Sequence, residues 1–170
     1  MPKQPDRKFS ILFLCTGNSA RSIIAESVLR QIGSDRFTAY SAGSFPKGEV
    51  HPEALKVLTD HGYPTEGLRS KSWDEFSVPG APEIDIVITV CDNAAGEICP
   101  IWPGRPVSAH YGLDDPAAVT GPPEDVTKAF ARTLKDLLTR LSLLNQLHVG
   151  SLDRLALRSR LQAIHDEADA

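Results

Sequence analysis

Apolar and polar residues follow two recurring patterns along the chain. Short apolar runs, rich in β-branched and aromatic residues, predict strands at residues 9–14, 37–42, 84–90 and 106–110. Apolar residues spaced three and four positions apart predict helices at residues 22–32, 52–61, 123–148 and 152–168. The mixed segment 65–80 contains Trp73 and Phe76, which we expect to anchor a short helix or a loop.

The order of these elements predicts the fold. Strands that alternate with helices form βαβ units, which build a parallel sheet with helices on both faces. We therefore expect an α/β fold of three layers, α/β/α, with a central four-stranded parallel sheet. Residues 1–149 would form the domain, and residues 150–170 a C-terminal helical extension. Two alternatives are open for this last helix, since it either packs back on the domain or serves a dimer.

The chemically interesting residues follow predicted strands. Cys15, Cys91 and the loop after His110 each come directly after a strand. In parallel sheets, ligands bind beyond the carboxyl ends of the strands, which lie at one edge. We therefore expect these three parts of the chain to gather at the same edge of the sheet.

The stretch between the first strand and the first helix carries the clearest signal. It reads Cys-Thr-Gly-Asn-Ser-Ala-Arg-Ser and starts at Cys15. A tight loop at a helix start can direct backbone N–H groups at an anion, and the helix dipole adds to their field. Arg21 is separated from Cys15 by five residues, so its planar guanidinium can clamp an oxyanion held beside the sulfur. The alternative is a buried cysteine that closes a strand, with Arg21 solvated. The predicted oxyanion-binding loop consists of Thr16, Gly17, Asn18, Ser19, Ala20 and Ser22.

Composition and charge limit the classes of partner. The chain has 170 residues, of which 41% are hydrophobic and 24% charged, with a formal net charge of −4 and a pI near 5.7. These values are typical of a globular protein with its own core, and they argue against a nucleic-acid or membrane surface. No run approaches the roughly 20 apolar residues of a transmembrane helix, and no signal peptide is evident. We expect a cytoplasmic protein with no nucleic-acid or membrane partner.

The three cysteines are Cys15, Cys91 and Cys99. An odd number in a chain without a secretion signal argues against a structural disulfide framework, so their redox chemistry would be catalytic. The alternative for Cys91 and Cys99 is a pair of inert buried thiols. Neither the cysteines nor the five histidines show the spacing of a metal site, so we expect no metal and no cofactor.

The loop sequence resembles the phosphate-binding loop of the low-molecular-weight protein tyrosine phosphatase superfamily. The Asp-Pro pair that begins at Asp115 resembles the general-acid position of that superfamily, and the resemblance covers roughly residues 11–148. It implies that Cys15 is the nucleophile, Arg21 the anion clamp and Asp115 the acid. Asp114 is a second candidate for the general acid. Its other possible role is to cap the loop.

Two branches of this superfamily share the fold, namely phosphatases and thioredoxin-coupled arsenate reductases. Phosphatases typically carry an aromatic residue after the Asp-Pro pair, whereas Ala117 and Ala118 stand here. The reductases carry two further cysteines in a segment with a Cys-Pro pair, as Cys91 and Cys99 are arranged here. The resemblance therefore implies an arsenate reductase in which Cys15, Cys91 and Cys99 act in turn.

The chemistry that this implies is a thiol relay. Cys15 attacks arsenate while Asp115 protonates the leaving oxygen. Cys91 then attacks the Cys15 sulfur and releases arsenite, and Cys99 attacks Cys91 to move the disulfide away. Thioredoxin is the expected reductant, with glutaredoxin or a low-molecular-weight thiol as alternatives. Two other functions stay open, a phosphatase acting on phosphotyrosine or aryl phosphates and a non-enzymatic oxyanion or redox sensor.

The resemblance also bears on whether a monovalent cation binds near the loop. Asn18, Glu26 and Ser41 match positions associated with the shape of the loop or with a nearby cation site. Lys71 falls where some relatives have an acidic cation ligand, and a lysine ammonium can substitute for a cation. We therefore expect no potassium site. The alternative for Glu26 is a solvated helix residue.

Overall fold

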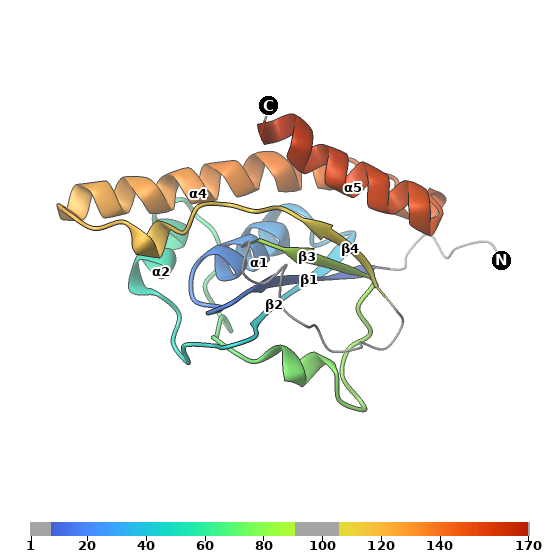
Figure 1. Ribbon diagram of the computed structural model, residues 1–170, viewed down its shortest axis with the longest axis horizontal. Helices are drawn as coiled ribbons and strands as arrows, with labels where there is room; N and C mark the ends of the chain where they lie inside the picture. Colours follow the sequence, from blue (N-terminus) through green and yellow to red (C-terminus); the bar gives the residue numbers. More distant parts are fainter. Residues whose placement is uncertain (1–7, 91–105, 170) are drawn as a thin grey trace.

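The structure is a computed structural model in which residues 8–90 and 106–169 are described, and at its centre is a parallel β-sheet (Figure 1). Its strands are β1 (Phe9–Cys15), β2 (Phe37–Gly43), β3 (Ile86–Thr89) and β4 (Val107–His110). The order across the sheet is β2-β1-β3-β4, and every neighbouring pair is parallel. The predicted four-stranded parallel sheet is confirmed, with β4 at one edge.

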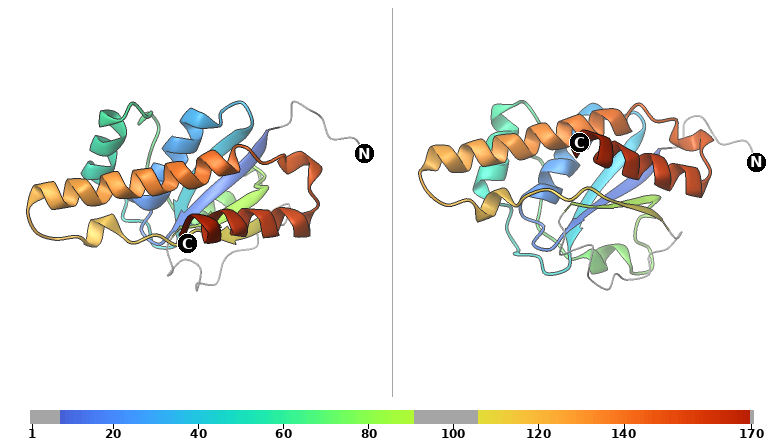
Figure 2. Two further views of the ribbon diagram at one scale, coloured as in Figure 1. Left: turned by 90° about the horizontal axis from the view of Figure 1, so that it is seen from above. Right: turned by 45° about the horizontal axis from the view of Figure 1, so that its top comes forward.

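Helices flank this sheet. The α-helices are α1 (Arg21–Ile32), α2 (Pro52–Asp60), α4 (Pro123–Leu144) and α5 (Arg154–Asp169). Short 3₁₀ helices are η1 (Trp73–Phe76), η2 (Pro116–Ala118) and η3 (Val149–Ser151). The four α-helices share a core with one face of the sheet, and η1 packs on the other face (Figures 1 and 2).

The central strand β1 sends side chains into two cores. Ile11 and Phe13 pack with the α-helices, whereas Leu12 and Leu14 lie on the side of η1. All four side chains are fully buried. A strand covered on both faces reads as a continuous apolar run instead of an alternating one, which is the pattern by which this strand was predicted.

The long helix is shorter than its apolar pattern predicts, because α4 ends at Leu144 and not four residues later. The Arg36 guanidinium donates to the carbonyl oxygens of Asn145 and Leu147, and the Asn145 side chain donates to the Ile32 carbonyl oxygen at 3.0 Å. These tertiary hydrogen bonds hold the backbone in turns in place of another helical turn. The apolar spacing continues past the end of the helix, so it could not reveal the boundary.

The last helix packs back on the domain. Leu157, Leu161 and Ile164 of α5 belong to the core that α4 and the sheet share. Arg140 on α4 donates through Nε to Nδ1 of His165 at 2.9 Å, and both side chains are buried. Figure 2 shows α5 against the C-terminal part of α4 and over β4. Of the two alternatives for this helix, packing on the domain is the one observed.

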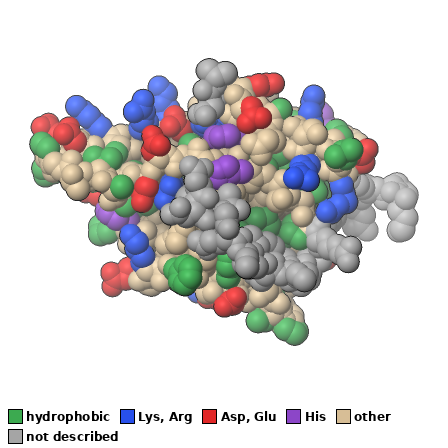
Figure 3. Space-filling model, viewed as in Figure 1, with side chains coloured by type: hydrophobic (Ala, Val, Ile, Leu, Met, Phe, Trp, Pro, Cys, Tyr) green, Lys and Arg blue, Asp and Glu red, His purple; other side chains and the backbone are tan. Residues whose placement is uncertain are grey.

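The surface carries charge of both signs. Blue and red side chains are interspersed along the helical layer at the top of Figure 3. Within residues 8–90 and 106–169, no helix has both the length and the apolar character needed to cross a membrane.

Candidate active site

The ends of the parallel strands bring the predicted site together. β1 ends at Cys15, whose register partner on β2 is Gly43. Leu14 pairs with Thr89 on β3, and Thr89 pairs with His110 on β4. The loop after Cys15 and the loop after His110 therefore lie at one edge of the sheet, as the order of strands predicted.

Cys91 and Cys99 lie outside the described residues. The last described residue before them is Val90, which is buried and donates its N–H to the Leu14 carbonyl oxygen at 2.8 Å. Pairing with β1 thus continues past the end of β3. The residue that precedes Cys91 lies beside the residue that precedes Cys15.

The loop after β1 turns carbonyl oxygens away from its centre. The carbonyl oxygens of Thr16, Gly17 and Ser19 accept hydrogen bonds of 3.0, 3.0 and 2.8 Å from backbone N–H groups of the segment 45–51. In a trans peptide, a carbonyl group and the N–H that follows it point in opposite directions. The N–H groups after these carbonyls therefore face the inside of the loop, which is the geometry of an anion-binding nest.

The close approach of β2 to this loop requires a residue without a side chain. A Cβ atom on Gly43 would lie 2.4 Å from the carbonyl oxygen of Thr16 and 2.9 Å from that of Cys15. A larger residue would push the loop away from the strand. The sequence pattern identified Gly43 only as a strand end, because its second role depends on the strand register.

Asn18 holds the shape of the loop. Its φ of +44° is the only positive φ among the non-glycine residues that the structure describes, and asparagine tolerates this conformation better than most residues. Its Oδ1 accepts from the backbone N–H of Lys71 at 2.8 Å, and its Nδ2 donates to Ser22 Oγ at 2.8 Å. The Asn18 side chain thus links the loop to the segment before η1 and to α1.

The sulfur of Cys15 lies at the start of α1. Cys15 is 3% exposed, and its Sγ is 3.2 Å from Ser22 Oγ. Because Ser22 Oγ already accepts from Asn18, the Ser22 hydroxyl is free to donate to the sulfur. A donor aimed at the sulfur and the positive end of the α1 dipole both favour the thiolate over the thiol.

Arg21 connects the loop with the segment after β4. Its Nη1 donates to the Leu113 carbonyl oxygen at 2.9 Å, and its Nη2 is 3.6 Å from Asp115 Oδ2. Its Nε is buried and has no hydrogen-bond partner within the described part of the chain. A buried donor without an acceptor costs about 1–3 kcal/mol, so this N–H indicates a place for an anionic ligand.

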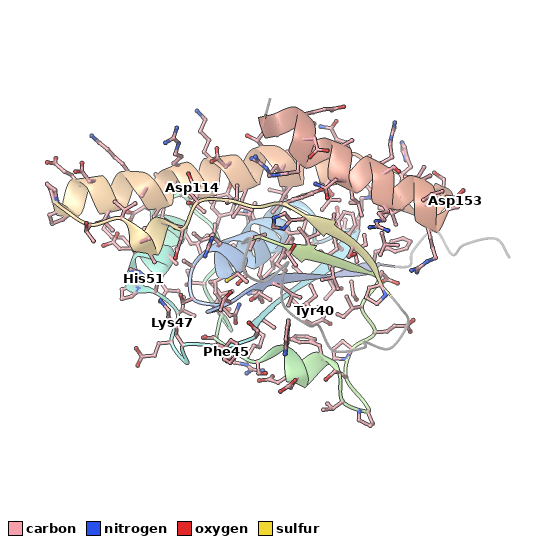
Figure 4. The ribbon with its side chains drawn as sticks, in the orientation of Figure 1. Tyr40, Phe45, Lys47, His51, Asp114 and Asp153 are labelled. Carbon is pink, nitrogen blue, oxygen red and sulfur yellow. The ribbon has the colours of Figure 1, made fainter. Side chains whose placement is uncertain are left out.

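Of the two neighbouring carboxylates, Asp115 is the one beside Arg21. Its Oδ1 accepts from the Ala117 N–H at 3.0 Å and so caps η2, and its Oδ2 is the atom that faces Arg21. Asp114 is exposed on the segment between β4 and α4 (Figure 4). The structure therefore shows which of the two neighbouring carboxylates lies beside the Arg21 guanidinium.

A cavity of about 160 Å³ lies beside this acidic segment. Its lining residues are Leu113, Asp114, Asp115, Pro116, Val119, Ala129, Arg132, Thr133 and Asp136. These residues carry no aromatic ring. A ring does lie near the loop on the segment after β2, where Phe45 is 73% exposed and donates its N–H to the Thr16 carbonyl oxygen (Figure 4). Sequence reasoning missed Phe45 because it considered only the residues after the Asp-Pro pair.

A buried ion pair lies next to the loop. Glu26 and Lys71 are 4% and 7% exposed, and Lys71 Nζ is 3.8 Å from Glu26 Oε1. The same carboxylate accepts hydrogen bonds of 2.6 Å from Ser41 Oγ and from Arg30 Nη2. Burial lowers the pKa of Lys71 from its usual value, and the Glu26 carboxylate opposes this shift. Glu26 is therefore not a solvated helix residue, because its buried carboxylate lies beside the Lys71 ammonium.

Replacing Lys71 with alanine should make the stability of the protein depend on potassium. The variant would leave the Glu26 carboxylate and Ser41 beside a space from which an ammonium has been removed. A cation that binds only the folded state should add about 1.4 kcal/mol to the free energy of unfolding at roughly tenfold its Kd. Urea unfolding in potassium chloride and in tetramethylammonium chloride of equal ionic strength measures this. Wild type should show no difference, and an equal response of both proteins would contradict the assignment.

Within the described residues, His, Cys, Asp and Glu side chains form no cluster of three that could hold a metal ion. The groups that the structure brings together at the site are the Cys15 sulfur, the inward N–H groups of the loop, the Arg21 guanidinium and the Asp115 carboxylate.

The combination of this fold with this loop defines a class of protein. Residues 10–148 match the family described as low molecular weight phosphotyrosine protein phosphatase, and the chain belongs to this family. The chain is 35% identical to the arsenate reductase of Halalkalibacterium halodurans over 131 residues, which cover 77% of this chain and 91% of that protein.

Solved structures share the fold. An arsenate reductase in its phosphate binding state superposes with a TM-score of 0.66 at 23% identity, over 81% of this chain and 96% of the other. The thioredoxin-dependent arsenate reductase of Corynebacterium glutamicum gives a TM-score of 0.54 at 23% identity, over 83% of this chain and 65% of the other. At these identities the structural likeness establishes the fold alone.

Proposed function

We propose that this protein is an arsenate reductase, which converts arsenate to arsenite through the thiols of Cys15, Cys91 and Cys99. The observation that carries the proposal is the buried Cys15 sulfur beside Ser22, in a loop whose N–H groups face inward and whose Arg21 has a buried Nε without an acceptor among the described residues. Arsenate has the shape and charge of phosphate, so it fits the same nest. The relatives named arsenate reductase support the choice of substrate.

In the first step, the Cys15 thiolate attacks arsenic and forms an S–As bond, and an arsenate oxygen leaves as water. The inward N–H groups of the loop and the Arg21 guanidinium bind the remaining oxygens. Asp115, which is 3.6 Å from Arg21, donates the proton to the leaving oxygen.

In the second step, the Cys91 thiolate attacks the Cys15 sulfur. An S–S bond forms and the S–As bond breaks, and its electron pair stays on arsenic, which leaves as arsenite. Cys99 then attacks Cys91, which frees the Cys15 thiolate and moves the disulfide. The pairing of Val90 with Leu14 supports this order, because these residues directly precede Cys91 and Cys15.

An external dithiol must reduce the final disulfide. We infer thioredoxin, because one structural relative is described as thioredoxin-dependent, and glutaredoxin or a low-molecular-weight thiol are the alternatives. Such reductants keep thiols reduced in the cytoplasm, where we place the protein. In this proposal residues 1–149 form the reductase domain and residues 150–170 an extension to it.

Replacing Cys91 with serine should abolish arsenate reduction and leave any hydrolysis of an aryl phosphate unchanged. Reduction needs a second thiol after the S–As adduct has formed, whereas hydrolysis of a phosphorylated cysteine needs only water. Arsenate-dependent oxidation of NADPH through thioredoxin and its reductase measures the first activity. Release of p-nitrophenol from p-nitrophenyl phosphate measures the second.

The matched control is Cys99→Ser. It should complete one turnover, stop with a disulfide between Cys15 and Cys91, and fail to turn over again. Full arsenate reduction by the Cys91→Ser variant would contradict the relay. Absence of a Cys91–Cys99 disulfide from peptide maps of oxidised wild-type protein would contradict its last step.

Hydrolysis of aryl phosphates, including phosphotyrosine, is the second candidate function. The observation that favours it is the exposed ring of Phe45 beside the loop, since an aromatic side chain can stack on the aryl group of a substrate. Rapid release of p-nitrophenol by wild type, without arsenate-dependent oxidation of NADPH, would replace the first proposal with this one.

A further inference from the structure

We propose that α5 positions the active site, because Gln162 and the Leu161 carbonyl oxygen hold the end of β4 and thereby set the places of Arg21 and Asp115. These α5 residues lie beyond residue 148, where the match to the family ends. The activity part of this proposal rests on the proposed function, and its anion-binding part does not.

The first contact is a side-chain amide that binds the edge of the sheet. β4 is an edge strand, and edge strands leave backbone groups without a neighbouring strand. Gln162 Oε1 accepts from the His110 N–H at 2.9 Å, and Gln162 Nε2 donates to the His110 carbonyl oxygen at 2.9 Å. A side-chain amide carries a donor and an acceptor side by side, so Gln162 binds His110 as another strand would.

The second contact involves the next residue of the chain. Tyr111 is fully buried, and its hydroxyl donates to the Leu161 carbonyl oxygen at 2.7 Å. Its ring stacks on His165, with 5.5 Å between centroids and an interplanar angle of 12°. Burial raises the pKa of Tyr111 above its usual value, so the hydroxyl keeps its proton and can donate. The last residue of β4 and the residue that follows it are thus anchored to two consecutive residues of α5.

These anchors lead directly to the candidate active site. A single residue separates Tyr111 from Leu113, whose N–H donates to the Val90 carbonyl oxygen at 3.1 Å. The Leu113 carbonyl oxygen is the acceptor that orients Arg21, and Asp115 follows two residues later. A shift of Tyr111 would therefore move both the acceptor for the guanidinium and the carboxylate.

A helix that only completed the core would need apolar contacts alone. α5 has such contacts through Leu157, Leu161 and Ile164. Besides its hydrogen bond with Arg140 of α4, three of its hydrogen bonds converge on His110 and Tyr111, which lead into the segment that contacts Arg21 and contains Asp115. This convergence separates a positioning role from a purely structural one.

Two variants test the proposal, Gln162→Ala and Tyr111→Phe. Tyr111→Phe removes one hydroxyl and keeps the ring, so it decides the question if Gln162→Ala does not fold. The matched control is Gln146→Ala, which removes an exposed glutamine just after α4. Circular dichroism and thermal unfolding establish that each protein is folded.

The first readout is protection of Cys15 by inorganic phosphate, measured as iodoacetamide labelling followed by peptide mass spectrometry. Without phosphate, we expect labelling rates within about twofold of wild type, because the contact between Cys15 and Ser22 is unchanged. The phosphate concentration that gives half-protection should rise about fivefold in both variants, since small displacements of binding groups weaken binding and catalysis. The kcat for arsenate should fall about tenfold, with a smaller change in KM.

The outcomes separate the two proposals. Loss of thermal stability with unchanged phosphate protection and unchanged kcat would overturn the positioning role and leave α5 a structural helix. The same shifts in the Gln146→Ala control would overturn it as well. If wild type protects Cys15 with phosphate but does not reduce arsenate, the proposed function fails, and weaker protection in both variants still supports the role of α5.

Discussion

Replacing Cys15 with serine should abolish arsenate reduction, with a loss in kcat of about 10⁴-fold or more. A serine hydroxyl keeps its proton at neutral pH and cannot form the disulfide with Cys91, so both steps are lost. Phosphate should still bind, because the inward N–H groups of the loop and Arg21 are unchanged. Oxidation of NADPH through thioredoxin measures the loss, and isothermal titration calorimetry measures phosphate binding.

The matched control for this prediction is Ser22→Ala, which keeps the sulfur and removes its hydrogen-bond partner at 3.2 Å. A hydrogen bond to a charged group contributes about 1.5–3 kcal/mol, so roughly a tenfold to hundredfold loss is expected, smaller than that of Cys15→Ser. A Cys15→Ser protein that kept about a hundredth of wild-type activity or more would show that another group attacks arsenate.

Replacing Asp115 with asparagine should lower kcat for arsenate by about 10²- to 10⁴-fold, the range typical of a lost general acid. Asparagine keeps a side-chain oxygen that can accept from the Ala117 N–H, so the start of η2 should be preserved. It cannot donate the proton that the leaving oxygen needs. Steady-state kinetics between pH 5 and pH 9 measure both the loss and its pH dependence.

The adjacent carboxylate supplies the control, because Asp114→Asn makes the same chemical change at an exposed position. Its kcat should stay within about threefold of wild type, in keeping with a surface substitution away from the reacting atoms. A large loss in Asp114→Asn together with full activity in Asp115→Asn would assign the acid to Asp114.

The fold followed from local patterns to a large extent. The apolar run of β1 and the spacing of apolar residues in α1 report which faces are buried, and burial is what these patterns encode. The end of α4 could not be predicted from the apolar spacing, because hydrogen bonds from Arg36 to the carbonyl oxygens of Asn145 and Leu147 end the helix although the spacing continues. An arginine more than a hundred residues away leaves no trace in a local pattern.

The anion loop was also evident from the chain alone. Cys15 and Arg21 are close in sequence, so a single tight turn brings the sulfur and the guanidinium to one place. The function that we propose depends in addition on Cys91 and Cys99, which resemblance to relatives identified and the described residues do not include. Their roles stay predictions, to be tested by the serine variants.

Contacts between distant parts of the chain determined which residues support the anion loop and the end of β4. Gly43 lies against the loop because β2 and β1 pair in one register. Lys71 lies beside Glu26 because its backbone is hydrogen-bonded to Gly43 at the end of β2 and to the Asn18 side chain. Gln162 reaches His110 from a helix 52 residues later. Local sequence thus determined which residues can carry the chemistry, whereas tertiary packing determined which distant residues hold them, because such contacts exist only once the sheet and its helices have assembled.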